Sequence, residues 1–504
     1  MAALCAAVML GIAACATTPE PSPPPPSVGP TTDPQDVWRP RFHFAPSTGQ
    51  LADPNGLVWY AGEWHLFHQS EGTWAHAVST DLVRWRTLPT ALEHDELGLA
   101  MSGSAVVDST NTSNLLPGGG LAALYTSTAG GEAQSLATST DRGRTWTRYG
   151  NNPVIPNDGR ADFRDPKVFW HEPTRRWVMV VSVGGAVELF ASTDLRQWSF
   201  LSRFGDEQGL HTAVWECPDL FPLPVDEGED VAWVLTVSVG DSAVTGGSTA
   251  QYFVGDFDGT TFTRRGPADL VQVTDVGQDF YAAQTWENAP DGRRLWLGWA
   301  GNWRAPYSAP TVGWQGQMSV PRELSLRTVD GLPRLTQKPA AELESLWGAA
   351  TTWRDLQVDG SRVVEWHGTS YELEAEIEVG TAQEVALHVR TGDGAEGGVR
   401  IGVTTGNGPQ FFVDRSGSGS PEPRARDGSD SPYVARRATW YRPVDGMVRL
   451  RVLVDASTVE AFVDDGTLVA TTLVYPPARA DGIAVSAAGG VATVRSLTVR
   501  PLRS

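Results

Sequence analysis

Three acidic residues lie beside prolines in segments that are far apart in the chain. Asp53 and Asp165 each directly precede a proline, and Glu216 lies two residues before one. A proline fixes its own φ angle and favours extended backbone in the residue before it, so each acid points in a preset direction. Taken singly, each segment has an ordinary alternative. Asp53-Pro54-Asn55-Gly56 is a good turn sequence, and Arg164 beside Asp165 can form a local ion pair.

Carboxyl groups that converge suit glycoside hydrolysis. This reaction needs a proton donor for the leaving oxygen and a carboxylate at the anomeric carbon. Its transition state is cation-like, so a further fixed anion stabilises it. An arginine hydrogen-bonded to that anion keeps it ionised. Only a fold that brings distant segments together can assemble such a site from Asp53, Asp165 and Glu216.

A short repeat predicts that fold. The motif Ser-Thr-Asp followed by a tryptophan recurs about 60 residues apart, between alternating apolar runs. The copies are Ser79–Trp85, Ser139–Trp146, Ser192–Trp198 and a degraded one at Asp256–Phe262. A period of roughly 50 to 60 residues with four short strands is typical of a propeller blade. We therefore predict a five-bladed β-propeller over residues 37–342, in which each aspartate caps a turn and each tryptophan packs between blades.

The sequence beyond residue 342 has a different texture. Tyr371–Val379 alternates strictly between apolar and polar residues, and so does Val448–Val454. Such alternation indicates half-buried antiparallel strands, and no stretch has helical periodicity. We predict a β-sandwich over residues 343–504, which makes the chain all-β.

The N-terminal segment resembles an export signal. Residues 1–15 form a small apolar run that fits a lipoprotein-type signal peptide, with Cys15 as the lipidated residue. The alternative is an ordinary signal peptide that is cut nearby. Residues 16–36 form a proline-rich linker. These features predict an exported protein, either secreted or held at the cell surface, whose contact with a membrane is an N-terminal lipid anchor.

Composition excludes several classes of function. The chain has 59 acidic and 39 basic residues, a net charge of −20, and no basic cluster. Nucleic acid is therefore not an expected partner. The 3 cysteines provide no disulfide framework and no cluster with zinc spacing, so neither a metal nor a cofactor is expected. The 20 tryptophans either fill a β core or offer stacking platforms for sugars.

An ordered set of segments carries a resemblance to a known family. The segments are LADPNGLVWYAGEWHLFHQ, WAHAVSTDLVRW, SGSAV, FRDPKVFW, WECPDLF, DFYAAQTW, GWAGNW, GQMSVPREL, RLTQKP and, near the C-terminus, VLVDASTVEAFVDDG. Over roughly residues 38–500 the chain resembles glycoside hydrolase family 32, the invertase, inulinase and levanase group. The resemblance implies a five-bladed propeller with a C-terminal sandwich, and retaining cleavage of β-D-fructofuranosyl linkages.

The resemblance also implies roles for individual residues. Asp53 would be the nucleophile, Glu216 the acid and later the base, and Asp165 the transition-state stabiliser, with Arg164 orienting Asp165 and binding fructose hydroxyls. The positions that would contact the fructose are Asn55, Gln69, Trp74, Ser104 and Trp303. For the two tryptophans the alternative is packing within the propeller. The family usually has Trp-Met-Asn before the nucleophile, whereas this chain has Gln-Leu-Ala, which removes an expected amide hydrogen bond to the sugar.

Two kinds of function remain open at this stage. The first is a hydrolase of fructans or fructo-oligosaccharides, acting on levan, inulin or sucrose and releasing fructose from chain ends. Release of a disaccharide, or fructosyl transfer to another sugar, is the alternative within this class. The second is a non-catalytic fructan-binding lipoprotein, for which three acids would be unnecessary. A propeller acting on arabinose polymers shares the architecture but not the fructan-type motifs.

Overall fold

The computed structural model describes residues 36–392, 394–395, 397–419 and 436–503. The predicted signal peptide, its Cys15 and all but the last residue of the predicted linker lie outside these ranges. The described regular structure is β-strand apart from four short 3-10 turns: η1 (Glu172–Thr174), η2 (Pro290–Gly292), η3 (Ala341–Leu346) and η4 (Asp464–Gly466). Within the described ranges no helix is long and apolar enough to span a membrane.

Five antiparallel sheets form a propeller, and each begins with its innermost strand. Blade one contains β2 (Pro54–Tyr60), β3 (Glu63–Ser70), β4 (Thr73–Ser79) and β5 (Trp85–Leu92). Blade two contains β6 (Ala100–Asp108), β7 (Gly120–Ser127), β8 (Ala133–Ser139) and β9 (Thr147–Arg148). Blade three contains β10 (Phe163–His171), β11 (Arg176–Val183), β12 (Ala186–Ser192) and β13 (Ser199–Phe204).

The last two blades carry extra short strands. Blade four contains β14 (Trp215–Pro224), β15 (Val231–Ser242), β16 (Gly247–Phe257) and β17 (Phe262–Arg264), with β18 (Gln272–Val273) paired to β16. Blade five contains β19 (Tyr281–Thr285), β20 (Leu295–Ala300), β23 (Arg322–Val329) and β24 (Leu332–Pro339), with β22 (Gln317–Met318) paired to β20. A separate parallel pair joins β1 (Gly49–Gln50) to β21 (Trp314–Gln315).

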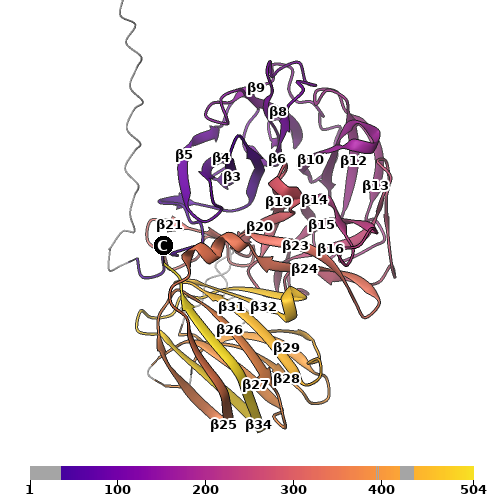
Figure 1. Cartoon of the computed structure of the whole chain (residues 1–504). Helices are drawn as coiled ribbons and strands as arrows, with labels where there is room; N and C mark the ends of the chain where they lie inside the picture. The colour runs from indigo at the N-terminus through magenta and orange to yellow at the C-terminus, as the bar shows by residue number, and fades with distance from the viewer. Residues whose placement is uncertain (1–35, 393, 396, 420–435, 504) are drawn as a thin grey trace, which may run out of the picture. The chain divides into compact units, whose positions relative to one another are not determined.

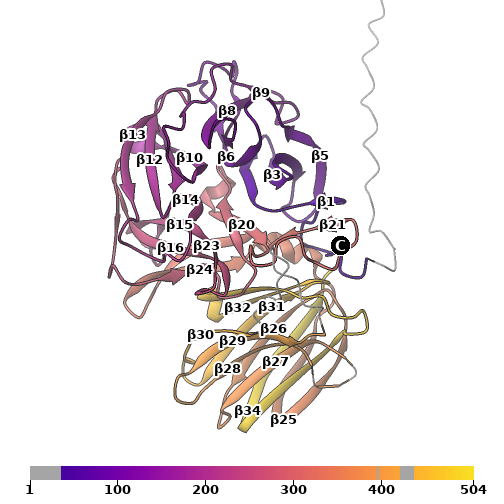
Figure 2. The ribbon, with the colours of Figure 1, turned by 180° about the vertical axis from the view of Figure 1, so that it is seen from behind.

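The innermost strands close into a ring. Strand β2 contacts β6, β6 contacts β10, β10 contacts β14, β14 contacts β19, and β19 returns to β2. The innermost strands labelled in Figure 1 lie around a common centre, and Figure 2 shows the same arrangement from behind. Residues near the starts of these five strands therefore meet, although they are far apart in the sequence. The predicted five-bladed propeller is confirmed.

In its three intact copies the aspartate of the repeated motif caps a turn, as the sequence predicts. Asp81 accepts hydrogen bonds from the backbone amides of residues 83 and 84, and Asp194 does the same for residues 196 and 197. In three copies the tryptophan indole donates to the carbonyl three residues earlier; the tryptophans are Trp85, Trp146 and Trp198. In the degraded copy the capping residue is Asp258, while Asp256 pairs with Arg265 on the surface.

The C-terminal strands form a second hydrophobic core. They are β25 (Thr351–His367), β26 (Tyr371–Glu378), β27 (Glu384–Thr391), β28 (Gly398–Thr404), β29 (Gln410–Gly417), β30 (Arg436–Trp440), β31 (Met447–Val454), β32 (Thr458–Val463), β33 (Leu468–Leu473) and β34 (Gly482–Pro501). The first part of β34 pairs with β27 and the second part with β26, so one long strand joins two halves of the sheet. Alternate residues of these strands, such as Leu373, Leu387 and Leu450, fill the space between the halves.

Candidate active site

A β-bulge interrupts each innermost strand within its first few residues. The interruptions lie between Asn55 and Val58, Met101 and Gly103, Arg164 and Lys167, Glu216 and Asp219, and Tyr281 and Gln284. A bulge leaves a residue unpaired and redirects its neighbours, and bulges concentrate next to active sites. Five bulges at the same level of one ring therefore turn side chains from all five blades towards the centre.

The bulges hold residues in the left-handed region of backbone space. Asp165 has φ 66°, Cys217 has φ 46° and Ala282 has φ 53°. Such a conformation costs a residue other than glycine on the order of 1 kcal/mol or more. In blade one the same place is taken by Gly56 at φ 55°, where a Cβ atom would lie 2.6 Å from the Phe67 ring. The residues with this unfavourable backbone conformation therefore lie at or next to the acids and their partners.

Asp53 lies directly before β2 and is half-buried. Its Oδ2 accepts a hydrogen bond of 2.8 Å from the Ser102 hydroxyl on β6. Its Oδ1 is buried and has no hydrogen-bond partner among the described residues. Burial, followed by the negative charge of Glu216, raises the pKa of Asp53 from 3.8 to about 6. The carboxyl group thus keeps one oxygen available for chemistry.

Asp165 on β10 is held by the backbone of the next blade. The amide of Cys217 donates 2.9 Å to its Oδ2. The Cys217 sulfur lies 3.6 Å from that oxygen and 3.7 Å from Oδ2 of Asp53, so the two aspartates face each other across one thiol. Burial raises the pKa of Asp165 to about 7, against the lowering effect of Arg164 and with the charges of Glu216 and Asp53 adding to it. The cluster therefore holds a proton near neutral pH.

Glu216 on β14 binds two side chains from neighbouring blades. Arg164 donates from Nε and Nη2 to Oε1 at 3.2 and 3.0 Å. The hydroxyl of Tyr281 on β19 donates to Oε2. The hydrogen bonds of Arg164 go to Glu216, Glu132 and Asp162, and its effect on Asp165 is through charge. That Arg164 orients Asp165 stays a prediction. The left-handed backbone at Asp165 turns these adjacent side chains apart.

Four of the predicted sugar contacts join blades one, two and three. Asn55 accepts from the Gly103 amide at 3.2 Å, and Gln69 donates to the Ala100 carbonyl at 3.0 Å. The Trp74 ring is fully buried, and its indole donates 2.9 Å to the Met101 carbonyl. Their role as substrate contacts stays a prediction, whereas for Trp74 the structure favours the packing alternative.

Ser104 fastens two blades together in the same way. Its hydroxyl donates 2.8 Å to the carbonyl of Pro166 and accepts 2.9 Å from the amide of Val168. The side chain is buried, and these two bonds hold β6 against β10 beside Asp165. The predicted contact of Ser104 with fructose is untested by this geometry.

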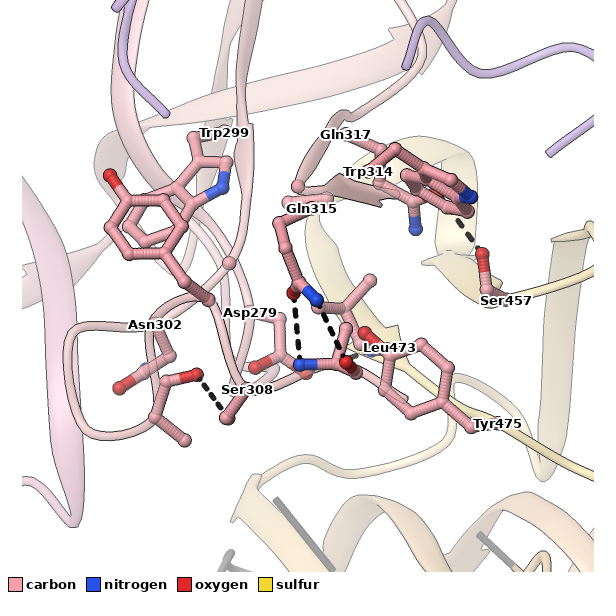
Figure 3. A pocket seen from close by; sticks show the side chains of 16 residues that line it. Asp279, Trp299, Asn302, Ser308, Trp314, Gln315, Gln317, Ser457, Leu473 and Tyr475 are labelled. Carbon is pink, nitrogen blue, oxygen red and sulfur yellow. Dashed lines mark hydrogen bonds between the residues drawn. The ribbon is translucent and has the colours of Figure 1, made fainter. Parts of the chain in front are cut away.

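Trp303 lies in an aromatic group beside the acids. Its ring centre is 5.0 Å from that of Trp299 and 6.4 Å from that of Tyr281, the partner of Glu216. The surrounding segment, residues 301–316, covers a small cavity of about 30 Å³. Figure 3 shows Trp299 on one side of this cavity and Ser457 and Tyr475 on the other. Trp303 is half-buried, and its contact with a sugar stays a prediction.

Sequence reasoning missed five residues that contact the predicted acids or Arg164. They are Ser102, Glu132, Asp162, Cys217 and Tyr281. Three of them have a signal in hindsight, because Ser102, Cys217 and Tyr281, like the acids, lie at or near the start of an innermost strand. Within the described ranges no group of three or more histidine, cysteine or acidic side chains could hold a metal ion.

Comparison with known proteins identifies the class. The model of the glycosyl hydrolases family 32 N-terminal domain matches residues 43–339, and that of the family 32 C-terminal domain matches residues 342–501. A levanase of Bacillus subtilis is 45% identical over 92% of this chain and 70% of its own length. A levanase of Bacillus sp. strain L7 is 41% identical over 93% of the chain, which spans 52% of that relative.

Solved structures agree with these matches. The exo-inulinase of Aspergillus awamori has a TM-score of 0.84 at 30% identity, covering 93% of this chain and 98% of that one. The β-fructofuranosidase of Schwanniomyces occidentalis in complex with fructosyl-erythritol has a TM-score of 0.82 at 27% identity, covering 95% and 100%. A propeller with acids at its centre and a second β domain is thus a glycoside hydrolase architecture. The chain belongs to glycosyl hydrolases family 32.

Proposed function

We propose that this protein is an exo-acting fructan hydrolase that removes fructose from levan or inulin, and that sucrose is a further substrate. The observation that carries the proposal is the convergence of Asp53, Asp165 and Glu216 at the propeller centre, with Asp53 Oδ1 buried and without a partner among the described residues. The levanase and exo-inulinase relatives support fructans as the substrate class.

In the first step, Asp53 acts as the nucleophile. Its free Oδ1 bonds to the anomeric carbon of the terminal fructosyl unit while the glycosidic bond breaks. Glu216 gives its proton to the departing oxygen, so the rest of the polymer leaves as an alcohol. Asp165 lies beside the carbon that becomes cation-like and stabilises it. The product of this step is a fructosyl ester of Asp53.

In the second step, water hydrolyses the fructosyl ester of Asp53. Glu216, now ionised, takes a proton from the water, and the oxygen attacks the anomeric carbon. The bond to Asp53 breaks, fructose leaves with retained configuration, and both acids return to their starting states. Transfer would differ only in the attacking hydroxyl. The half-buried Trp303 would stack on the sugar, and Arg164 would bind its hydroxyls.

The experiment that tests the proposal is a product analysis. The purified chain is incubated separately with levan, inulin and sucrose, and the products are resolved by chromatography. Fructose as the first product from a polymer supports exo-hydrolysis, and the relative rates identify the linkage. A disaccharide as the first product would replace the exo assignment. Binding to polymer without any product would favour the non-catalytic fructan-binding lipoprotein.

Export and domain limits are part of the same proposal. The relatives include enzymes described as extracellular exo-inulinases, which supports an exported protein. We propose residues 1–15 as the signal peptide, Cys15 as the lipid-bearing residue, and 16–36 as the linker that holds the enzyme off the surface. We also propose the domain boundary between residues 342 and 343, which falls within η3, between β24 and β25. Metabolic labelling with a fatty acid, compared with a Cys15→Ala variant, tests the anchor.

A further inference from the structure

The guanidinium of Arg164 is shared among acids that the proposed mechanism does not use. Its Nη1 donates to both oxygens of Glu132 at 3.1 Å and to Oδ1 of Asp162 at 2.8 Å. Its Nε and Nη2 donate to Glu216. Glu132 lies in the turn between β7 and β8, and Asp162 directly precedes β10. Both carboxylates are partly exposed, at 30% and 36%.

This arrangement creates a conflict for the proposed acid. Glu216 must carry a proton in order to give it to the leaving oxygen. A guanidinium that donates two hydrogen bonds to a carboxylate stabilises its charged form and so opposes that proton. Two further anions on the opposite edge of the same guanidinium offset this effect, because they spread its positive charge and add negative charge near Glu216.

We propose that Glu132 and Asp162 are positioning residues. By binding the other edge of Arg164 they weaken its interaction with Glu216, so that Glu216 keeps its proton, and the enzyme its activity, to higher pH. This inference rests on the proposed role of Glu216 as the general acid. The other charged or titratable groups that act on the site around Glu216 are Asp53, Asp165, Cys217 and Tyr281. All four groups stay in place when Glu132 or Asp162 is substituted.

The test measures kcat/KM for fructose release against pH in Glu132→Gln, Asp162→Asn and the double variant. Each single variant should move the basic limb of the profile to lower pH by roughly half a unit to one unit, and the double variant should move it further. Glu132→Asp, which keeps the charge, should restore most of the limb. A structural role alone would lower kcat/KM equally at every pH.

The matched control is Asp158→Asn. Asp158 lies in the same segment as Asp162, is 70% exposed and pairs with Arg160 instead of Arg164. Its profile should overlay that of the unaltered protein. A double variant whose basic limb also overlays would overturn the inference.

A Glu216→Gln variant separates the two proposals. One outcome is that Glu216→Gln loses turnover by about a thousandfold or more while the basic limb of the double variant stays at the pH of the unaltered protein. In that case the role of Glu132 and Asp162 is refuted and Glu216 remains the acid. If Glu216→Gln keeps its turnover and its pH profile, Glu216 is not the acid and both proposals fail. Thermal unfolding of each variant checks that these substitutions leave the fold intact.

Discussion

Two buried clusters of charged side chains in this molecule differ in how well their charges are matched. The cluster that we propose is catalytic, called the catalytic cluster below, comprises Asp53, Arg164, Asp165 and Glu216. The junction cluster comprises His43, Asp275, Arg322, Asp455 and Glu460. In the catalytic cluster one guanidinium faces three acids, and the pKa values of both aspartates are raised. In the junction cluster two bases serve three acids, and nearly every polar atom is used.

The junction cluster ties propeller segments to the C-terminal strands. His43 binds Asp455 at 2.9 Å through Nδ1 and Glu460 at 3.0 Å through Nε2. Arg322 donates 2.8 Å to Glu460 and 3.1 Å to Asp275. Although burial opposes charge, hydrogen bonds and the charge of His43 lower the pKa of Asp455 to about 2. These ions are paired, so they stabilise one arrangement of the chain and have no free atom to react.

The comparison teaches how to distinguish a reactive charge cluster from a structural one. Burial alone does not separate them, since both are hidden from solvent. The difference lies in the larger excess of negative charge at the propeller centre and in an oxygen with no partner among the described residues, which Asp53 has and Asp455 lacks. A site that stabilises a cation-like transition state must hold negative charge that has no partner in the free protein, and this charge lowers the stability of the fold.

The largest expected effect breaks the catalytic side of the comparison. Asp53→Asn should lower kcat for fructose release by about 10⁴-fold or more, because an amide cannot form the fructosyl ester. Its melting temperature should be unchanged or higher, since a buried unmatched charge is removed. Rate measurements with levan or inulin and a thermal melt at pH 7 check both parts. Substantial residual turnover in a homogeneous sample would remove Asp53 from the nucleophile role.

The next effect breaks the junction side. Arg322→Met should lower the free energy of unfolding by about 3 to 5 kcal/mol, because Glu460 and Asp275 are left buried without their partner. The matched control is Arg203→Met, whose ion pairs with Asp206 and Glu188 lie near the surface and whose loss should cost about 1 kcal/mol or less. Denaturant titration measures both. Arg322→Met should keep its kcat/KM while folded; a large loss of kcat/KM would contradict the structural assignment.

A third prediction uses the pH dependence of the junction cluster. Although burial lowers it, the bonds to Asp455 and Glu460 raise the pKa of His43 from 6.5 to about 9. The stability that this histidine contributes is therefore complete below about pH 6.5 and is lost as pH rises through 9, by roughly 3 kcal/mol. His43→Gln should flatten the unfolding free energy between these pH values. An unchanged slope in denaturant titrations at several pH values would refute the assignment.

The smallest effect measures the stability cost of the catalytic cluster. The raised pKa of Asp165 means that its charge disfavours the folded state, so stability falls as pH rises from about 4 to about 7. Asp165→Asn should therefore raise the free energy of unfolding by about 1 kcal/mol at pH 7, and less at pH 4. Asparagine also tolerates the left-handed backbone of this position. A variant that is destabilised at both pH values would mean that Asp165 is structural.

Much of the fold was readable because its causes are local. The Ser-Thr-Asp turns of Asp81 and Asp194 depend on side-chain hydrogen bonds to amides two and three residues away. The alternation in Tyr371–Glu378 reports a strand with one buried face. Their spacing predicted blades and a second β domain, and the ordered motifs predicted the family, which the matches confirm. In the degraded copy the repeat pointed to Asp256, whereas the residue that caps the turn is Asp258, two positions later.

The partners within the site were not readable, because they depend on bulges and on closure of the ring. Arg164 and Asp165 are neighbours in the sequence, yet the left-handed φ of Asp165 sends one side chain to Glu216 and the other to the Cys217 amide. Glu132 and Asp162 carry no local sequence signal, and they matter only because two neighbouring blades present them to Arg164.

The sequence by itself therefore determined which residues could react and which segments form blades, since composition, turns and periodicity act over a few positions. The tertiary structure decided which charges are matched. His43 and Asp53 are ten residues apart, but one enters a saturated cluster with Asp455 and the other faces the propeller centre with a free oxygen. That difference is set by contacts across hundreds of residues, which no local pattern encodes.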